Sequence, residues 1–582
     1  MRPAATQPPL SDLRGGRAGG EPANSDWFAR WALYSPDKVA MQDADSGRAC
    51  TYAECRTAVD RAARLLRDEF GVGEGDRVAV LALTEIEYVF LLFAVQKLGA
   101  ILVPLNFRLT PREVGYLLGD SRPKLLIHQR QFDALVERLE PGVRPERVLH
   151  FDGDDSYLSR LADPARSAEP LPVLAGPDTP CMILYTSGTS GAPKGAMITP
   201  GMIFWNSVNT TLRLNLTQSD VTLTYTPLFH TGGWNVLTTP FLHRGARLVF
   251  LKKFDPDRFL ELAERERVTV LFGLPTIMEM LRRSPRFERT DLSAARYAIV
   301  GGELMPLELI RFWQARGIPI RQGYGLTEFG PNVFSLQEEH AEAKIGSIGF
   351  PNFYIEARVV DDEDRALPPG EIGELVLRGP VCTPGYWNNP EATAAALRGG
   401  WFHTGDLVRQ DAEGFFYVVD RKKDMYKSGG ENVYPAEVEH FLRMHPAVRE
   451  VAVVGVPDAK WGEVGKAYVV LQPDARLSAQ EVIAFCQTGL AKYKTPRHVA
   501  FLAELPRGDS GKVLKRSLRE PPFHPEPRDA GFRIRDSGEQ RPHPPAPSPA
   551  CGRGGERQEL GAVPPLPPAG EGVASEARAS RG

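Results

Sequence analysis

An apolar run from Met182 to Leu184 leads directly into a stretch of serine, threonine and glycine that ends at Lys194. Glycines let main-chain N–H groups approach an anion closely, hydroxyls donate further hydrogen bonds, and the lysine supplies positive charge. A flexible linker would need neither the preceding strand nor the internal Pro-Lys-Gly. The stretch therefore predicts a strand followed by a loop that wraps an oligophosphate. Its spacing is not G-x-x-x-x-G-K-[ST], which argues against a P-loop kinase or ATPase.

Composition bounds the class of protein. A chain of 582 residues, 42% hydrophobic and 25% charged, is long enough for several domains and typical of soluble globular proteins. Lysine plus arginine (70) nearly balance aspartate plus glutamate (73), so no nucleic-acid partner is expected. The six cysteines are scattered without a C-x-x-C pair or a histidine at ligand spacing. This argues against disulfides or a zinc site and favours a reducing, cytoplasmic location.

Neither the termini nor the most apolar stretch predict a membrane segment. Residues 1–24 are rich in glycine, proline and arginine and have no apolar core, which predicts a disordered leader rather than a secretory signal. Residues 519–582 have a similar composition and predict a disordered tail. The apolar stretch 86–105 is interrupted by Glu87 and Lys97. We therefore expect a core helix followed by a strand, and no integral membrane segment.

Helical and β-rich patterns alternate from residue 25 to 420, which predicts a large doubly wound α/β sheet. Residues 355–386 hold short strand patterns without helices between them and suggest a small barrel-like cap. A charged break at 420–424 precedes a compact α+β unit. Thr51, Thr110 and Ser478 each begin a capping box. Strands are expected at 78–82, 100–104, 125–128, 221–225, 246–251, 268–272, 297–300, 451–456 and 465–471, and helices at 85–98 and after Tyr434.

Further segments combine glycines with chemically active side chains. Glycines after an apparent strand indicate a turn at the ligand edge of a doubly wound sheet, although an ordinary tight turn has the same pattern. In the segment 323–328, Tyr324 could stack on a ring, Thr327 could bind a phosphate and Glu328 could ligate Mg²⁺. Asp406, with Arg421 downstream, could bind the two hydroxyls of a ribose. The Ser-Gly-Lys sequence at 510–512 places Lys512 at a turn. These segments are 227–235, 300–304, 323–328, 401–407 with Arg421, and 506–516.

Taken together and in this order, the segments resemble the AMP-forming adenylating superfamily, which includes acyl-CoA synthetases, adenylation domains of nonribosomal peptide synthetases and firefly luciferase. The resemblance covers about residues 25–518. It implies an N-terminal domain (25–420) of two doubly wound α/β subdomains plus a small β-barrel, and a smaller mobile α+β C-terminal domain (421–518). It also implies that a carboxylate first attacks the α-phosphate of MgATP, and that a thiol then attacks the acyl-adenylate.

The resemblance also implies roles for individual residues. Lys512 would bridge the acyl carboxylate and the α-phosphate, Thr327 would contact that phosphate, and Glu328 would ligate Mg²⁺. The β- and γ-phosphates would be wrapped by Thr186, Ser187, Gly188, Thr189, Ser190 and Lys194. The adenosine would be held by Gly302, Glu303, Leu304, Gly323, Tyr324, Gly325, Asp406 and Arg421. The acyl pocket would comprise His230, Trp234, Asn235, Gly301, Pro331 and Val333, with Lys423 as the hinge and Ser428, Gly429 and Gly430 at the CoA tunnel.

The acid and the acceptor are less closely defined. The pocket is mostly apolar, and Thr231 stands where an amino-acid adenylation domain would want an aspartate. A fatty or aryl acid is therefore expected, of undetermined chain length. Free CoA is the expected acceptor, a separate acyl carrier protein is the alternative, and a non-catalytic nucleotide-binding relative is a remote one. The expected small molecules are thus the acid, ATP, Mg²⁺ and CoA; a homodimer is left open.

Overall fold

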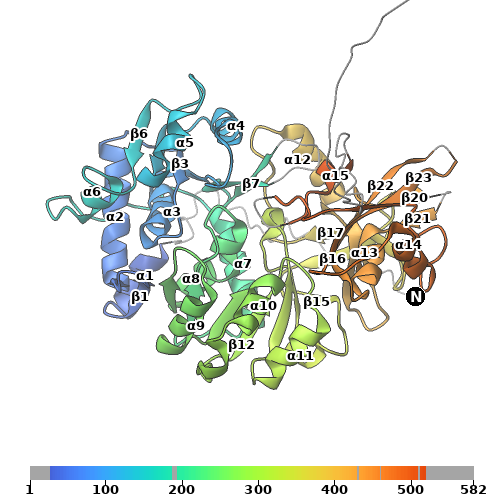
Figure 1. Ribbon diagram of the computed structural model, residues 1–582. Coiled ribbons are helices and arrows are strands. Elements are labelled where there is room, and N and C mark those ends of the chain that lie inside the picture. The colour runs from blue at the N-terminus through green and yellow to red at the C-terminus, as the bar shows by residue number, and fades with distance from the viewer. Residues whose placement is uncertain (1–25, 187–192, 429–430, 459, 509–511, 520–582) are drawn as a thin grey trace, which may run out of the picture. The chain divides into compact units, whose positions relative to one another are not determined.

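The computed structural model describes residues 26–186, 193–428, 431–458, 460–508 and 512–519 (Figure 1). The predicted leader and, from residue 520 onward, the predicted tail lie outside the described residues. In the described part, helices flank mixed sheets (Figure 1), which confirms the predicted α/β class of fold. The domain boundary at the charged break stays a prediction.

The first sheet, as numbered here, holds strands β3 to β8 and ends in the hairpin that carries Lys194. Its pairs are parallel from β6 to β7, and β8 is antiparallel to β7. Helices cover both of its faces, which explains why its central strands are mostly apolar. The strand order is β6 (Arg147–His150), β5 (Leu125–His128), β3 (Arg77–Leu81), β4 (Ile101–Pro104), β7 (Met182–Thr186) and β8 (Lys194–Ile198). The helices of this region are α1 (Trp27–Tyr34), α2 (Tyr52–Asp68), α3 (Ile86–Leu98), α4 (Pro111–Ser121), α5 (Asp133–Glu137) and α6 (Tyr157–Ala162).

A second, smaller sheet combines strands from distant parts of the sequence. β1 pairs with β10 and β10 with β9 in parallel, while β2 is antiparallel to β1. The order is β2 (Ala49–Thr51), β1 (Val39–Asp43), β10 (Arg247–Phe250) and β9 (Val221–Thr224). The helices that follow along the chain are α7 (Pro200–Leu214), α8 (Thr238–Arg244), α9 (Pro256–Arg265), α10 (Pro275–Arg283), α11 (Leu307–Ala315) and α12 (Pro390–Ala396).

The third sheet changes character along its width. β11, β12 and β13 are parallel, and every later pair is antiparallel. The order is β11 (Val270–Gly273), β12 (Tyr297–Val300), β13 (Ile320–Tyr324), β14 (Phe334–Leu336), β15 (Ser347–Pro351), β19 (Phe416–Arg421), β18 (Phe402–Gln410), β17 (Ile372–Arg378) and β16 (Glu356–Val360). Among the described residues β16 pairs only with β17, so the expected small barrel is instead the open end of this sheet.

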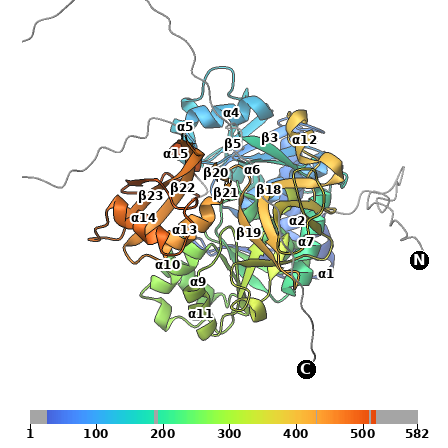
Figure 2. The same cartoon turned by 90° about the vertical axis from the view of Figure 1, so that its right-hand side faces the viewer.

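The C-terminal α+β unit has a fourth sheet with a core on each face. Val453 and Val469 face α13 (Pro435–Arg443) and α14 (Ala479–Gln487), which lie beside the strands in Figure 2. Val454 and Tyr468 face the other way, with Leu518 of α15 (Lys515–Arg519). The strand order is β21 (Glu431–Val433), β20 (Tyr426–Ser428), β23 (Gly462–Leu471) and β22 (Val448–Asp458), with β24 (His498–Phe501) also on β23.

Local signals in the sequence locate many elements closely. The strands expected at 125–128 and 297–300 are β5 and β12, residue for residue. The boxes at Thr51, Thr110 and Ser478 form: each side chain accepts a hydrogen bond from the main-chain N–H three residues on, and the glutamate there accepts one in return. These helices therefore begin where their caps predict.

The apolar stretch 86–105 is the helix α3 and the strand β4, as expected. Every residue of α3 is buried, as a helix that is apolar all round requires. None of the helices in the described ranges combines the length and apolarity that crossing a membrane would need. Lys97 of α3 is buried, and its Nζ lies 2.5 Å from Asp26 Oδ2 and 2.9 Å from Asp60 Oδ1. This lysine thus neutralises carboxylates from two other segments.

Replacing Lys97 by methionine should destabilise the fold strongly. The substitution leaves Asp26 and Asp60 without their buried counter-ion, which commonly costs about 3–5 kcal/mol of unfolding free energy. Lys124→Met is the matched control, because Lys124 is 41% exposed in its ion pair with Asp76. The control should change the unfolding free energy by less than about 1 kcal/mol. Urea denaturation followed by tryptophan fluorescence measures both, and equal midpoints for the two variants would contradict this account.

Candidate functional site

The ends of two neighbouring parallel strands bring two of the predicted glycine segments together. β12 and β13 run in the same direction, so Gly301–Leu304 and Gly325–Glu328 both follow the carboxyl edge of the sheet. A Cβ on Gly301 would lie 3.3 Å from the carbonyl oxygen of Gly323, which places these segments in contact. The two segments therefore lie side by side at one edge of the sheet.

Two glycines of this edge disfavour a side chain, Gly302 through its backbone conformation and Gly325 through lack of space. Gly302 has a φ of +81°, and a Cβ there would lie 2.8 Å from Leu274 Cδ2. A Cβ on Gly325 would lie 2.2 Å from the main-chain carbonyl carbon of Pro331. The edge therefore presents bare main chain, which a flat ring or a phosphate can approach closely.

Glu328 faces the hairpin that frames the predicted phosphate loop. Its Oε1 accepts a hydrogen bond from the Tyr386 hydroxyl at 3.0 Å and lies 3.5 Å from Thr186 Oγ1. Lys194 Nζ lies 5.3 Å from the centre of the Tyr386 ring. Thr186 and Lys194 pair across β7 and β8. The structure thus gathers a carboxylate, two hydroxyls and a cation; Ser187, Gly188, Thr189 and Ser190 lie outside the described residues.

Asp406 is a buried carboxylate held from two sides. β18 and β19 pair Asp406 with Arg421, whose Nε lies 2.6 Å from Asp406 Oδ1. The Tyr324 hydroxyl donates to the other oxygen at 2.5 Å. Burial raises the pKa of Asp406, while the positive charge of Arg421 opposes this shift. Three of the residues predicted to hold adenosine, Tyr324, Asp406 and Arg421, therefore form one network, and each carboxylate oxygen keeps a further lone pair for a hydroxyl.

Lys512 reaches the same region from the C-terminal unit. Burial lowers the pKa of Lys512, the charge of Arg421 lowers it further, and the carboxylates of Glu303 and Asp406 oppose both effects. Although protein groups surround its ammonium, the Lys512 residue as a whole is exposed to solvent, and it adds positive charge to this region. The predicted catalytic lysine is thus brought to the predicted adenosine-binding residues.

His230 lies in a buried and electropositive place. Burial, with the charges of Arg108 and Lys512, lowers the pKa of His230 to about 4. Its Nε2 is buried without a hydrogen-bond partner among the described residues, and its ring lies against Phe229, with centroids 4.5 Å apart. The imidazole is therefore neutral near pH 7 and has a nitrogen available for a ligand.

The other predicted pocket residues divide into two groups. Trp234, Asn235 and Val333 are buried, and the Trp234 indole N–H donates to the Leu228 carbonyl. Asn235 uses its own amide groups on Thr231 and Thr239. These three support the wall from behind and do not reach open space. Gly301 and Pro331 are partly exposed near the bare main-chain edge, so with His230 they form the accessible part of the predicted pocket.

The remaining predicted residues do not form a single group in the described part of the structure. Thr327 begins a short turn, Thr327–Phe329, and Glu303 and Leu304 are exposed. The carbonyl of Lys423 accepts a hydrogen bond from Arg519 Nη1 at 3.1 Å, within the C-terminal part of the chain. Ser428 is buried on β20, whereas Gly429 and Gly430 lie outside the described residues. Hinge and tunnel roles stay predictions.

The arrangement matches known proteins over most of the chain. Residues 28–387 match the sequence model of the AMP-binding enzyme family, and residues 437–512 match that of the AMP-binding enzyme C-terminal domain. The chain belongs to the AMP-binding enzyme family. This confirms the predicted membership of the adenylating superfamily and the prediction of an AMP-forming ligase.

Individual relatives agree with the family assignment. The chain is 42% identical to a feruloyl-CoA synthase of Amycolatopsis sp. over 493 residues, covering 85% of this chain and 98% of that one. It is 40% identical to the indoleacetate–CoA ligase of Aromatoleum aromaticum, covering 85% and 97%. Among solved structures, the o-succinylbenzoate CoA synthetase of Bacillus subtilis in complex with its acyl-adenylate superposes with a TM-score of 0.77 at 32% identity, covering 86% and 98%.

Sequence reasoning missed two residues of the site. Tyr386 meets Glu328 and Lys194 only because Tyr386 forms a β-bridge with Ala196 of β8, a long-range contact. Arg108 contributes charge beside His230 and lies over the rings of Phe107 and Phe229. The pocket was expected to be mostly apolar, and Arg108 adds a positive charge next to it. The aromatic residues next to Arg108 and Tyr386 are the only local signals that could have indicated them.

Acid should destabilise this enzyme through His230. The unfolded chain binds a proton near pH 6.5 but the folded one only near pH 4, so stability is lost as pH falls between these values. His230→Gln should remove about 2–4 kcal/mol of this loss. The measurement is urea denaturation at pH 7 and pH 4.5. His440→Gln, which replaces an exposed histidine of α13, is the control and should follow the wild-type protein. Parallel curves for all three proteins would refute the shift.

Proposed function

We propose that this AMP-binding enzyme joins an apolar monocarboxylic acid, an aryl acid by preference, to CoA through an acyl-adenylate. The observation that carries the proposal is the position of Lys512. Its charge acts both on His230, in the predicted acyl pocket, and on Asp406, in the predicted adenosine site. A lysine between these two places is where a carboxylate would meet the α-phosphate of ATP.

The residues divide the work of holding ATP. Asp406, with Arg421 behind it, accepts the ribose hydroxyls, and the bare main chain at Gly302 and Gly325 with the Tyr324 ring encloses the adenine. Thr327 contacts the α-phosphate. Thr186, Lys194 and the loop between them wrap the β- and γ-phosphates, because hydroxyls, main-chain N–H groups and a lysine are the donors that phosphates need.

The Glu328 carboxylate fits a magnesium ion. It is an oxygen ligand beside the hydroxyls of Thr186 and Tyr386, and Mg²⁺ is commonly held by one or two carboxylates together with substrate phosphates. When bound, the ion neutralises phosphate charge and orients the pyrophosphate as leaving group. The remaining steps depend on side chains and main-chain groups of the protein.

In the first half-reaction, an oxygen of the substrate carboxylate attacks the α-phosphorus, and the bond from that phosphorus to the bridging oxygen breaks. Pyrophosphate leaves with the electron pair. Lys512 binds the carboxylate and the α-phosphate together and stabilises the charge that gathers between them. In the second, the CoA sulfur attacks the acyl carbonyl carbon and AMP leaves. The thiol proton passes to solvent, since nothing in the described residues identifies a base for it.

Apolar surroundings favour the class of acid. The neutral His230 imidazole, the ring of Phe229 and the aliphatic parts of Pro331 and Leu274 offer little to a charged second group. Thr231 offers no carboxylate to an amine. The relatives at 42% and 40% identity are named for feruloyl and indoleacetate, both aryl acids. Their names support an aryl acid ahead of a fatty acid. The cysteines of the described residues are free thiols, which supports the cytoplasm as the place of reaction.

A panel of acids tests this proposal. Purified enzyme with ATP, Mg²⁺ and CoA is offered hydroxycinnamic, arylacetic, medium- and long-chain fatty, dicarboxylic and amino acids, and pyrophosphate release is measured. We expect the highest kcat/KM with aryl acids. A preference for dicarboxylic acids would show that Arg108 recruits a second carboxylate and would overturn the monocarboxylic assignment. Replacing CoA by a holo-acyl carrier protein tests the alternative acceptor.

Lys512→Ala should separate the two half-reactions. Loss of this charge should lower acid-dependent ATP–pyrophosphate exchange by about 10²–10³-fold, since the lysine acts where charge develops. CoA attack on a supplied acyl-adenylate should change by less than about threefold, because the phosphate charge is then already bound in the adenylate. Lys492→Ala removes an exposed lysine from the same part of the chain and is the control. Equal losses in both half-reactions would contradict the role of Lys512.

A further inference from the structure

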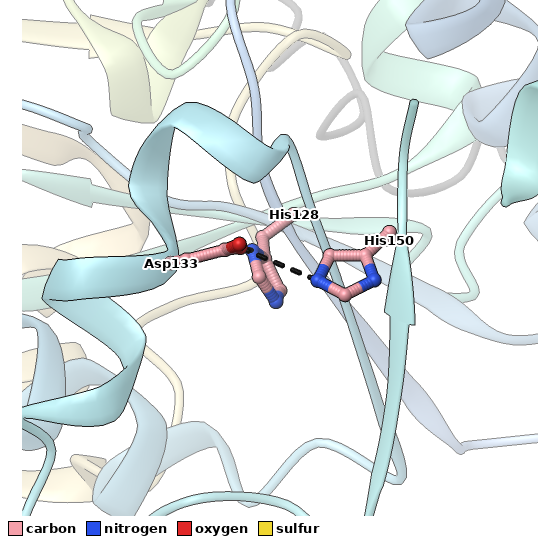
Figure 3. Close-up of side chains that lie close together, drawn as sticks. All are labelled: His128, Asp133 and His150. Atoms are coloured by element: carbon pink, nitrogen blue, oxygen red, sulfur yellow. Dashed lines mark ion pairs between the residues drawn. The ribbon is translucent and has the colours of Figure 1, made fainter. Parts of the chain in front are cut away.

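Two histidines and an aspartate meet at one edge of the first sheet, away from the residues assigned to ATP. β5 and β6 are parallel and pair His128 with His150, the last residue of each strand. Asp133 is the first residue of α5, which follows β5. Figure 3 shows its carboxylate directed toward both imidazole rings. Within the described part of the chain, no other group of three such side chains brings its ligand atoms within 4.8 Å of one another.

The separations in this cluster resemble the edges of a metal tetrahedron. Asp133 Oδ1 lies 3.3 Å from His150 Nε2 and 3.4 Å from His128 Nδ1. Ligands bound to one tetrahedral zinc ion at about 2.0–2.1 Å are about 3.3–3.4 Å apart. Good N–H···O hydrogen bonds are shorter, about 2.7–3.2 Å. The three groups therefore lie farther apart than direct bonding would place them, and at the spacing that a shared ion would give.

A second observation also points to a ligand. Asp133 Oδ1 is buried and has no hydrogen-bond partner among the described residues. A buried carboxylate oxygen without a partner is costly, so an unfilled acceptor between two imidazoles calls for a cation. The His128 side chain is 4% exposed, whereas those of His150 and Asp133 are 36% and 40% exposed. The cluster thus has a closed back and an open front through which an ion can enter.

We propose that His128, Asp133 and His150 bind a zinc-like divalent cation whose fourth position is open to water. Imidazole and carboxylate donors together suit zinc and its neighbours in the first transition series, while Mg²⁺ and Ca²⁺ prefer oxygen alone. The bound ion would join the ends of β5 and β6 to the start of α5. The scattered cysteines argued against a zinc site, but these ligands come together only through the parallel pairing of β5 and β6.

One contact competes with the ion. His128 Nδ1 lies 3.2 Å from the carbonyl oxygen of Gln129, to which it would donate in the tautomer with hydrogen on Nδ1. Binding an ion through Nδ1 requires the other tautomer, with hydrogen on Nε2, and gives up this contact. The site should therefore bind more weakly than a zinc site whose ligands have no alternative partner.

Cobalt(II) titration of the full-length protein, without ATP or Mg²⁺, tests the proposal. We expect the visible absorption of a four- or five-coordinate Co²⁺ ion, which Zn²⁺ should displace. Asp133→Asn and His150→Gln should each weaken binding of Co²⁺ by at least about 10-fold, since each removes one of three protein ligands. His440→Gln, an exposed histidine on α13, is the matched control and should not change the affinity. Absorption from Co²⁺ bound elsewhere on the protein should be the same in every variant and is subtracted from each spectrum.

Hydrogen exchange supplies a measurement that does not depend on colour. Adding Zn²⁺ should slow exchange in peptides covering residues 125–150 of the wild-type protein, and should not do so in His150→Gln. His150 is partly exposed, so this variant should fold even if Asp133→Asn does not. Binding that both variants leave unchanged, or a wild-type protein that binds no Co²⁺ at this edge, would overturn the proposal and leave a cluster held by hydrogen bonds through water alone.

Discussion

The buried carboxylate of Asp406 is the constraint around which the proposed adenosine site is arranged. It lies on β18. One partner, Arg421, comes from the next strand, β19, and the other, Tyr324, comes from β13, which is distant in the sequence. A buried anion is tolerated only when it is paired and hydrogen-bonded, so Arg421 and the Tyr324 hydroxyl must be in place for this region to be stable. The same requirement fixes the position of the Tyr324 ring. A stability requirement of the open end of the third sheet thereby places three groups that can hold a nucleoside.

The parallel half of that sheet contributes main chain rather than side chains. β12 and β13 both end at this edge, where a positive φ favours glycine at 302 and the main chain of Pro331 leaves no room for a Cβ at Gly325. The antiparallel half contributes the side chains, from β18 and β19. A mixed sheet is therefore more than a variation on the doubly wound pattern. It places bare main chain, suited to a ring or a phosphate, beside a paired carboxylate, suited to hydroxyls.

Local signals in the sequence predicted what depends on neighbouring residues. The capping boxes at Thr51 and Thr110 and the strands β5 and β12 are local patterns, and all were located closely. Strand pairing is not local, so the short strands after residue 355 were expected to close into a barrel, although they form the open end of a sheet. Tyr386 and Arg108 were missed for the same reason. Trp234 was assigned to the acyl pocket through the family resemblance, and the structure shows it fully buried in the core; its role stays a prediction.

The charges near His230 explain why this histidine is neutral. Burial disfavours the charged form, and Arg108 and Lys512 already bring two positive charges to this region, to which a protonated imidazole would add a third. Lys512 itself has a lowered pKa, first because protein groups desolvate its ammonium and second because Arg421 is positively charged. Positive charges thus gather around His230 and Lys512, and the carboxylates of Glu303 and Asp406 offset part of the repulsion between Lys512 and Arg421. Both proposed substrates are anions, and their binding would relieve that repulsion. If the proposed function is right, this concentration of positive charge favours binding of a carboxylate and a triphosphate together.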